Sequence, residues 1–205
     1  MAENLRIAVL ASGEGTNLGA IIKAQDEGIL GNARVSLVIS DNPEAKALVR
    51  ARESGITTAV IEKNSSITPE EFDGLLIDEL GKASVDLVVL AGFMRVLGKK
   101  MVNAFSGRII NIHPALLPCF KGVSGVSDAF DYGVKVTGVT VHFVDEGVDT
   151  GPIILQGHVD VEQADTKLSL EQKIHALEHQ LYPRAIRLFV DGKLKIEGRK
   201  VLILE

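Results

Sequence analysis

The sequence is poor in several residue types, and each shortage excludes a class of protein. Its 205 residues include no Trp and one Cys, and only 4% of them are aromatic. The single cysteine, Cys119, cannot form an internal disulfide, which excludes a small secreted domain stabilised by disulfides. No apolar run approaches the roughly 20 residues that span a bilayer, and the first residues lack the basic region of a leader peptide. We therefore expect a cytoplasmic protein without membrane contact, in which the sequon Asn64-Ser65-Ser66 is not used.

Positive charge is also in short supply. The chain has 22 Lys+Arg against 27 Asp+Glu, a net charge of −5, and no basic block. Because proteins hold nucleic acid mainly through cations on its phosphates, nucleic acid is not an expected partner. The rest of the composition, 46% hydrophobic and 24% charged, is that of an ordinary globular protein. At this length we expect one domain, residues 1–205, with a sizeable aliphatic core.

Short apolar runs alternate with helix-like segments in the first half of the chain. Buried strands are expected over four ranges: 7–11, 35–39, 58–61 and 85–90. Helices are expected around Leu18–Ile22, over about 44–54, and from Thr68-Pro69 onward, where Thr68 is a cap and proline fits the first helical position. Continuously apolar strands suit a parallel sheet that is covered on both faces. This order predicts an α/β fold with a doubly wound, Rossmann-like, mostly parallel sheet.

The second half changes character, and a mixed sheet is expected there. Strands are predicted over three ranges: 108–112, 137–144 and 151–161, the last two as an antiparallel pair. A long amphipathic helix follows, opened by a capping box of Ser169 and Gln172 and kinked at Pro183. The tail over 193–204 is expected to form a closing strand or hairpin.

Ligands of open α/β sheets bind beyond the carboxyl ends of the strands, so motifs at those ends have extra weight. One is the turn Ser12-Gly13-Glu14-Gly15-Thr16-Asn17-Leu18, between the first strand and the first helix. Glycines allow a tight turn, and the free N–H groups of a helix start suit a phosphate. The turn lacks the third glycine of a dinucleotide site and the Gly-Lys-Ser/Thr of a Walker loop. The alternative is an ordinary turn in which Thr16 or Asn17 caps the helix.

A second motif, Asn111-Ile112-His113-Pro114, ends a predicted strand. Strand alternation places Asn111 and His113 on one side of the chain and Ile112 in the core. An amide and an imidazole that converge can stabilise an oxyanion and relay a proton. A histidine at a strand end can equally be a loop residue with an ordinary hydrogen bond.

The acidic, glycine-containing loop from Asp145 to Pro152 is a third candidate. It is either a solvated turn or the source of a carboxylate that favours the protonated form of a nearby histidine.

A fourth pattern, His175-Ala176-Leu177-Glu178-His179, matches the H-x-x-E-H motif of inverted zinc proteases. His175 and His179 lie one helical turn apart and could share a zinc ion. A zinc site needs a third protein ligand, and no second acidic motif stands out nearby. A zinc hydrolase is therefore the last of the alternatives.

Four motifs together resemble those of the phosphoribosylglycinamide formyltransferase family. The motifs are Gly13-Glu14-Gly15-Thr16-Asn17-Leu18, Leu90-Ala91-Gly92-Phe93-Met94-Arg95-Val96-Leu97, Asn111-Ile112-His113-Pro114-Ala115-Leu116-Leu117-Pro118 and His142-Phe143-Val144-Asp145-Glu146-Gly147-Val148-Asp149-Thr150-Gly151-Pro152-Ile153-Ile154. They follow one another in the family's order and spacing, and the resemblance spans nearly the whole chain. It implies a single formyltransferase domain in which about 1–100 binds phosphate and about 101–205 holds the folate and the catalytic residues.

The resemblance also implies a reaction. The formyl group of 10-formyltetrahydrofolate, a co-substrate, would pass to the amine of 5-phosphoribosylglycinamide (GAR) in purine biosynthesis, without a metal. Asn111 and His113 would stabilise the oxyanion of the tetrahedral intermediate. Asp149 would keep His113 protonated and help to move a proton from the amine to the folate nitrogen.

Binding residues follow from the same resemblance. The GAR site would contain Gly15, Thr16, Asn17, His175 and Glu178. The folate site would contain Met94, Arg95, Val96, Leu97, Asn111, Asp145, Glu146, Gly147, Val148 and Asp149. The expected partners are these two small molecules, together with a second copy of the chain in a homodimer.

Two positions depart from the family pattern. Pro69 stands where the family often has a basic residue that is thought to meet the folate, and no neighbouring cation is an obvious substitute. Ser124 stands at about the place of a histidine that many members carry after the Leu-Leu-Pro motif. Neither departure touches Asn111, His113 or Asp149.

Other proteins that use formyl-folate remain as alternatives. Methionyl-tRNA formyltransferase resembles this catalytic half but needs a further C-terminal domain, and the chain ends at Glu205 with a negative net charge. A formyltetrahydrofolate deformylase would carry an extra N-terminal domain, for which no room is expected before the first strand. A non-catalytic binding protein would not need Asn111, His113 and Asp149 together.

Overall fold

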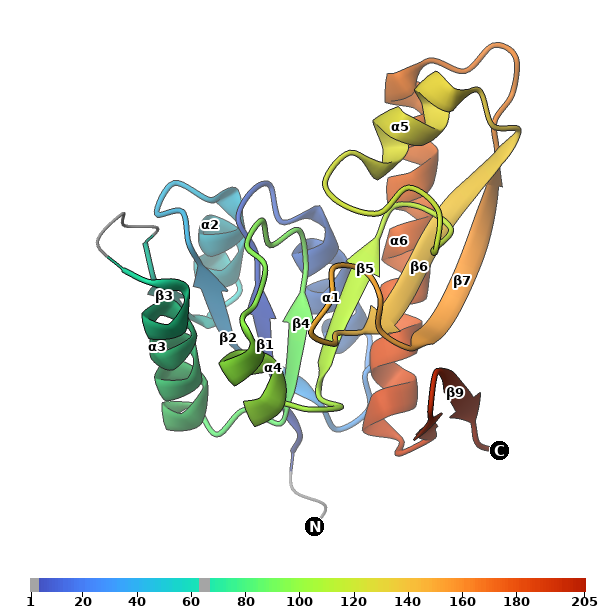
Figure 1. Cartoon of the computed structure of the whole chain (residues 1–205). Helices are drawn as coiled ribbons and strands as arrows, with labels where there is room; N and C mark the ends of the chain where they lie inside the picture. The colour runs from blue at the N-terminus through green and yellow to red at the C-terminus, as the bar shows by residue number, and fades with distance from the viewer. Residues whose placement is uncertain (1–3, 63–66) are drawn as a thin grey trace.

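A computed structural model describes residues 4–62 and 67–205, so the sequon Asn64-Ser65-Ser66 lies outside the described residues. One nine-stranded sheet runs through the molecule (Figure 1). Its strands, in spatial order, are β3 (Thr57–Val60), β2 (Arg34–Ser40), β1 (Arg6–Leu10), β4 (Leu87–Leu90), β5 (Ile109–His113), β6 (Val136–Phe143), β7 (Ile153–Asp160), β9 (Lys200–Ile203) and β8 (Leu194–Glu197). The predicted single-domain α/β fold with a mixed sheet is confirmed.

The two halves of the sheet differ in strand direction. Strands β3, β2, β1, β4 and β5 are parallel, whereas β6 runs antiparallel to both of its neighbours, β5 and β7. On its other side β7 pairs with β9 in parallel. The tail forms the expected hairpin of β8 and β9. Chain order reverses between β1 and β4, so a crevice is expected beyond their carboxyl ends. The loops that follow these two strands therefore carry the first candidate side chains.

Helices cover both faces of the sheet (Figure 1). One face packs against α1 (Thr16–Asp26), α2 (Lys46–Glu53) and α6 (Lys167–Val190), and the other against α3 (Pro69–Lys82) and α4 (Lys99–Ala104). Successive side chains of β1 alternate between the two cores: Ile7 and Val9 face α1, whereas Ala8 and Leu10 face α3. No prediction covered α4 or α5 (Gly125–Tyr132), which are short, with six and eight residues.

The start of α6 differs from the predicted one. Its capping box joins Thr166 and Ser169, each side chain accepting the other's backbone N–H, so the prediction of Ser169 with Gln172 was wrong. The helix then runs without interruption through Pro183. Next to that proline, the buried hydroxyl of Tyr182 lies 2.7 and 3.0 Å from two strand carbonyl oxygens. This contact joins α6 to β4 and β5. None of the helices in the described ranges is long and apolar enough to cross a bilayer.

Candidate active site

The glycine turn after β1 leads directly into α1. Gly15 is the N-cap of α1 and adopts a left-handed backbone with φ of 70°, and no side chain caps the helix. The alternative in which Thr16 or Asn17 caps α1 is therefore wrong. A Cβ at Gly15 would lie 2.8 Å from the Cα of Ala47, so the turn also packs tightly on α2. Uncapped N–H groups at a helix start are suited to an anion.

Asn17 and Glu178 meet inside the molecule. The Asn17 Nδ2 donates a 2.9 Å hydrogen bond to Oε2 of Glu178, and both side chains are buried. Within the described part of the chain, the Oδ1 of Asn17 is buried without a partner. Burial raises the pKa of Glu178, and the opposing effects of Asn17 and His175 leave it above its usual range. Two residues predicted for the GAR site are thus in contact, although 161 positions separate them.

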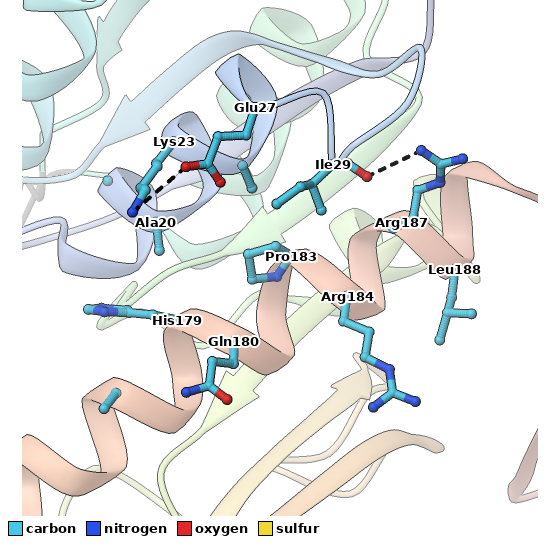
Figure 2. A pocket seen from close by; sticks show the side chains of 13 residues that line it. Ala20, Lys23, Glu27, Ile29, His179, Gln180, Pro183, Arg184, Arg187 and Leu188 are labelled. Carbon is cyan, nitrogen blue, oxygen red and sulfur yellow. Dashed lines mark hydrogen bonds and ion pairs between the residues drawn. The ribbon is translucent and has the colours of Figure 1, made fainter.

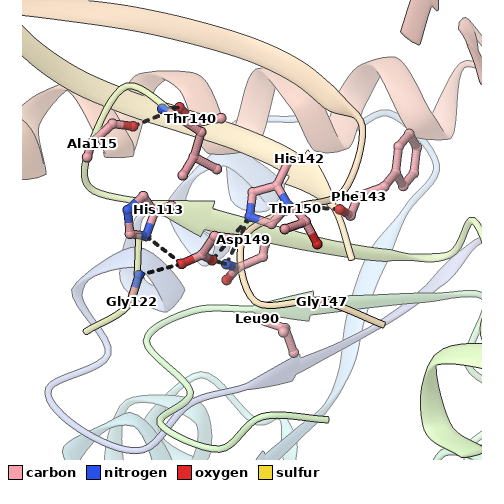
Figure 3. A network of polar contacts seen from close by, with 12 residues as sticks. Leu90, His113, Ala115, Gly122, Thr140, His142, Phe143, Gly147, Asp149 and Thr150 are labelled. Carbon is pink, nitrogen blue, oxygen red and sulfur yellow. Dashed lines mark hydrogen bonds and ion pairs between the residues drawn. The ribbon is translucent and has the colours of Figure 1, made fainter. Parts of the chain in front are cut away.

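Asn111, His113 and Asp149 come together at the end of β5. Figure 3 shows His113 beside Asp149. The Nδ1 of His113 lies 3.4 Å from Oδ2 of Asp149, and the amide Nδ2 of Asn111 lies 3.5 Å from Oδ1. His113 is 3% exposed. Ile112, which lies between Asn111 and His113 in the strand, points into the core. Strand alternation therefore predicted the side on which Asn111 and His113 lie.

The loop after β5 holds the other side of His113. The Nε2 of His113 lies 2.7 Å from the carbonyl oxygen of Phe120, and the backbone N–H of Gly122 donates a 2.8 Å hydrogen bond to Oδ2 of Asp149. Both ring nitrogens of His113 thus face oxygen atoms, and a doubly protonated ring can donate to both. No pattern in the sequence predicted these backbone contacts.

Asp149 is held as a charged carboxylate. Burial alone raises the pKa of Asp149, but a hydrogen bond from His142, the Gly122 N–H and the charges of His113 and His142 outweigh it and lower the pKa. Its backbone adopts a left-handed conformation with φ of 52°, which is uncommon for a residue other than glycine. Strained backbone of this kind is often found at functional sites.

His142 is a site residue that the sequence analysis did not single out for a role. It is the antiparallel partner of Asn111 in the register of β5 and β6. Its Nε2 lies 3.2 Å from Nδ2 of Asn111 and 3.6 Å from Oδ1 of Asp149, while Nδ1 lies 2.8 Å from the Phe143 carbonyl oxygen. A signal was available, because the alternation of β6 and its pairing with β5 place His142 beside Asn111.

The predicted folate residues lie on two loops that approach each other. Met94 and Val96 are 64% and 72% exposed, whereas the side chain of Leu97 is buried in the core. Directly after this segment, Lys99 forms a 2.9 Å ion pair with Glu146 of the acidic loop. The exposed apolar side chains of Met94 and Val96 therefore lie on a segment that is joined, through Lys99 and Glu146, to the acidic loop.

The acidic loop is ordered by its own side chains. Asp145 accepts hydrogen bonds from the backbone N–H of Gly147 and from the hydroxyl of Thr150. The Arg199 side chain of the terminal hairpin donates a 3.0 Å hydrogen bond to the Thr150 carbonyl oxygen. These contacts support the loop on both sides of Asp149.

The two histidines of the zinc-like motif stack on one another instead of converging. Their ring centroids are 6.4 Å apart with an interplanar angle of 12°. His179 faces a groove of about 820 Å³ between α1 and α6 (Figure 2), and burial followed by the charge of His175 lowers its pKa. Across residues 4–62 and 67–205, no group of three or more His, Cys, Asp or Glu side chains is placed to hold a metal ion. None of the predicted site residues lines the groove.

Comparisons with known proteins place this arrangement in a family. The formyl transferase family matches residues 5–186. The chain is 43% identical over 182 residues to the phosphoribosylglycinamide formyltransferase of Bacillus subtilis (strain 168), covering 89% of this chain and 93% of that protein. It is 41% identical over 191 residues to the human trifunctional purine biosynthetic protein adenosine-3, covering 93% of this chain and 19% of that protein.

Solved structures agree with the sequence relatives. The crystal structure of glycinamide ribonucleotide transformylase 1 from Symbiobacterium toebii matches with a TM-score of 0.96 and 48% identity, over 100% of this chain and 96% of that one. The chain therefore belongs to the formyl transferase family, whose members transfer a formyl group. Within that family its place is among the phosphoribosylglycinamide formyltransferases.

Proposed function

We propose that this chain transfers the formyl group of 10-formyltetrahydrofolate to the amine of GAR, and that Asn111, His113 and Asp149 carry the reaction. The observation that carries this proposal is their convergence at the end of β5. An amide donor, an imidazole and a buried carboxylate at one point are the groups that formyl transfer to an amine requires.

In the proposed mechanism the GAR amine attacks the formyl carbon. A carbon–nitrogen bond forms, and the carbonyl electron pair moves to oxygen to give a tetrahedral oxyanion. The N–H groups of Asn111 and protonated His113 stabilise that oxygen, a contribution of about 2.7–4 kcal/mol for one such donor. The intermediate then collapses, and the bond between carbon and the folate N10 breaks.

Proton transfer falls to the Asp149 carboxylate. The attacking amine must lose a proton, and the departing folate nitrogen must gain one. Asp149 is charged and lies beside His113, so it can stabilise the imidazolium while the amine attacks. It can then accept the amine proton through water and pass it on to the departing folate nitrogen, which restores the carboxylate. The N–H of Gly122 holds the carboxylate in place for this role.

The GAR phosphate is proposed to bind at the start of α1, on Gly15, Thr16 and Asn17. The tight turn and the uncapped helix start support this assignment. Glu178 and His175 on α6 would contact the rest of the substrate, since Glu178 is already joined to Asn17. Backbone N–H groups can hold the phosphate despite the chain's net charge of −5.

The folate is proposed to lie between residues 94–97, here named the folate segment, and the loop 145–149. The exposed Met94 and Val96 offer apolar surface to its rings, and the Lys99–Glu146 ion pair joins the two loops next to them. A phosphate-binding first half and a folate-binding second half, a cytoplasmic location and a homodimer remain predictions.

The decisive experiment is a formyl-transfer assay with GAR and 10-formyltetrahydrofolate and no added metal. Turnover that needs both compounds is the expected result. An absence of transfer by the wild-type protein would contradict the proposal. Release of formate without GAR would favour a deformylase instead.

A further inference from the structure

Two neighbouring residues of α3 pack against the folate segment and the residues that follow it. Phe72 and Asp73 are 3% and 2% exposed, and neither belongs to the residues expected to touch a substrate. Both side chains contact the stretch of chain from Phe93 to Met101. A buried carboxylate is costly unless it is paired or hydrogen-bonded, so the partners of Asp73 indicate what it does.

Asp73 caps a helix that is not its own. Its Oδ1 accepts a 3.0 Å hydrogen bond from the N–H of Gly98, and its Oδ2 accepts a 3.1 Å hydrogen bond from the N–H of Met101. Gly98 is the N-cap of α4 and has no side chain to supply this cap itself. A Cβ at Gly98 would collide with the Asp73 carboxylate, so the two residues fit only as this pair.

Phe72 fixes the middle of the same stretch. Its ring lies 3.6 Å below the guanidinium carbon of Arg95 and stacks on Phe93 with centroids 6.5 Å apart. Arg95 is thereby held on the α3 side, while its neighbours Met94 and Val96 face outward. The segment is consequently anchored in its middle by Phe72 and at its end by Asp73.

We propose that Asp73 is a positioning residue for the folate site, acting through the backbone of residues 94–98 without touching the folate. This inference rests on the proposed function, because it takes residues 94–97 to be the folate segment. The physical reason is the length of α4. A helix of six residues has little stability of its own, so its start and the segment joined to it depend on the cap.

Two substitutions test the proposal. Asp73→Asn has the same shape but keeps one acceptor oxygen and turns an NH₂ group toward the other backbone N–H. Asp73→Ala removes both acceptors. Asp86→Asn is the matched control, because Asp86 also accepts a backbone N–H, from Arg6, at the opposite end of the sheet. For each protein we would measure KM for both substrates, kcat, the melting temperature and tetrahydrofolate affinity by calorimetry.

We expect the Asp73 substitutions to change the constants for the folate and to leave those for GAR nearly unchanged. KM for 10-formyltetrahydrofolate and Kd for tetrahydrofolate should rise about fivefold in Asp73→Asn and about 30-fold in Asp73→Ala, the range that corresponds to a lost helix cap. The KM for GAR and kcat should stay within about twofold, because uniform folate binding is what has been weakened. Asp86→Asn should leave all these constants unchanged.

Other results would overturn it. A lower melting temperature with an unchanged folate KM and Kd would make Asp73 a purely structural cap. A parallel rise of both KM values in Asp73→Asn would mean general damage and would equally refute the proposal. If wild-type protein binds tetrahydrofolate but transfers no formyl group to GAR, the proposed function fails, and the calorimetric series still decides the role of Asp73.

Discussion

The Asn17 amide donates a 2.9 Å hydrogen bond to the Glu178 carboxylate, and this contact joins the first helix of the fold to its longest one inside the candidate site. The carboxylate is buried, and burial dominates the rise of its pKa. The side-chain oxygen of Asn17 is also buried, and no partner for it is present in the described ranges. The pair is therefore suited to a substrate better than to stability.

Glu178→Gln is expected to stabilise the protein at neutral and alkaline pH. The folded pKa of Glu178 lies above its unfolded value, so its favourable contribution is complete below about pH 4.3 and is lost as pH rises through the folded pKa. A glutamine stays neutral and can also donate to the free Asn17 oxygen. We expect a gain of about 1 kcal/mol at pH 8 that shrinks toward pH 5.

Denaturant unfolding of both proteins at the two pH values measures this difference. GAR binding should weaken in the same variant, since the charged carboxylate is proposed to contact the substrate. If the variant is less stable than wild type at pH 8, the Glu178 carboxylate does not lower the stability of the folded wild-type protein.

Asn111→Ala and Asp149→Asn should each lower kcat by at least about 100-fold, because they remove an oxyanion donor and the proton-transfer carboxylate. Steady-state kinetics at saturating GAR and 10-formyltetrahydrofolate measures the loss. Asp145→Asn, in the same loop but outside the contacts of His113, is the control and should lose far less. Equal losses in Asp145→Asn and Asp149→Asn would point to loop disorder instead of chemistry.

Gly15→Ala should destabilise the protein and raise KM for GAR. The change puts a side chain on a left-handed residue, and its Cβ would lie 2.8 Å from the Cα of Ala47. Gly28→Ala is the control, because Gly28 has φ of 74° but open space around it. We expect a cost of about 1 kcal/mol for Gly28→Ala and about 2–4 kcal/mol for Gly15→Ala. Equal melting temperatures in the two variants would contradict the tight packing of the turn on α2.

Tyr182→Phe should lower the free energy of unfolding by about 1–3 kcal/mol, because two buried strand carbonyls lose their nearest hydroxyl. Thermal denaturation measures the change. Tyr132→Phe serves as the comparison, since Tyr132 is 80% exposed and should have almost no effect. If the stability of Tyr182→Phe equals that of the wild-type protein, the two carbonyl groups find other hydrogen-bond partners.

Much of the fold follows from local patterns in the sequence. Most of the parallel strands are apolar runs, and the predicted Thr68 cap with proline at the first helical position appears in the structure. The features that the sequence did not predict depend on contacts between residues that are distant in the sequence. The cap of α4 comes from Asp73, and no reading of Gly98 and its neighbours alone could have supplied it. The same holds for Phe120 and Gly122, whose backbone groups contact His113 and Asp149.

The site residues divide in the same way. Asn111 and His113 follow from strand alternation, and the family resemblance added Asp149, which lies against both. His142 needs the register between β5 and β6, which the sequence does not state directly. The spacing of residues along the sequence thus predicts site residues within one strand more readily than site residues that strand pairing brings together.

Because Glu178 lies on α6, 161 positions after Asn17, the contact between these two residues cannot form until α6 has been synthesised. Contacts between residues so far apart in the sequence slow folding, since a long loop must close before the contact forms. A ribosome-bound chain that stops before α6 would expose the apolar faces of α1, β6 and β7 that this helix covers. Synthesis of α6 therefore both completes the proposed ligand site and covers apolar surface that could otherwise aggregate.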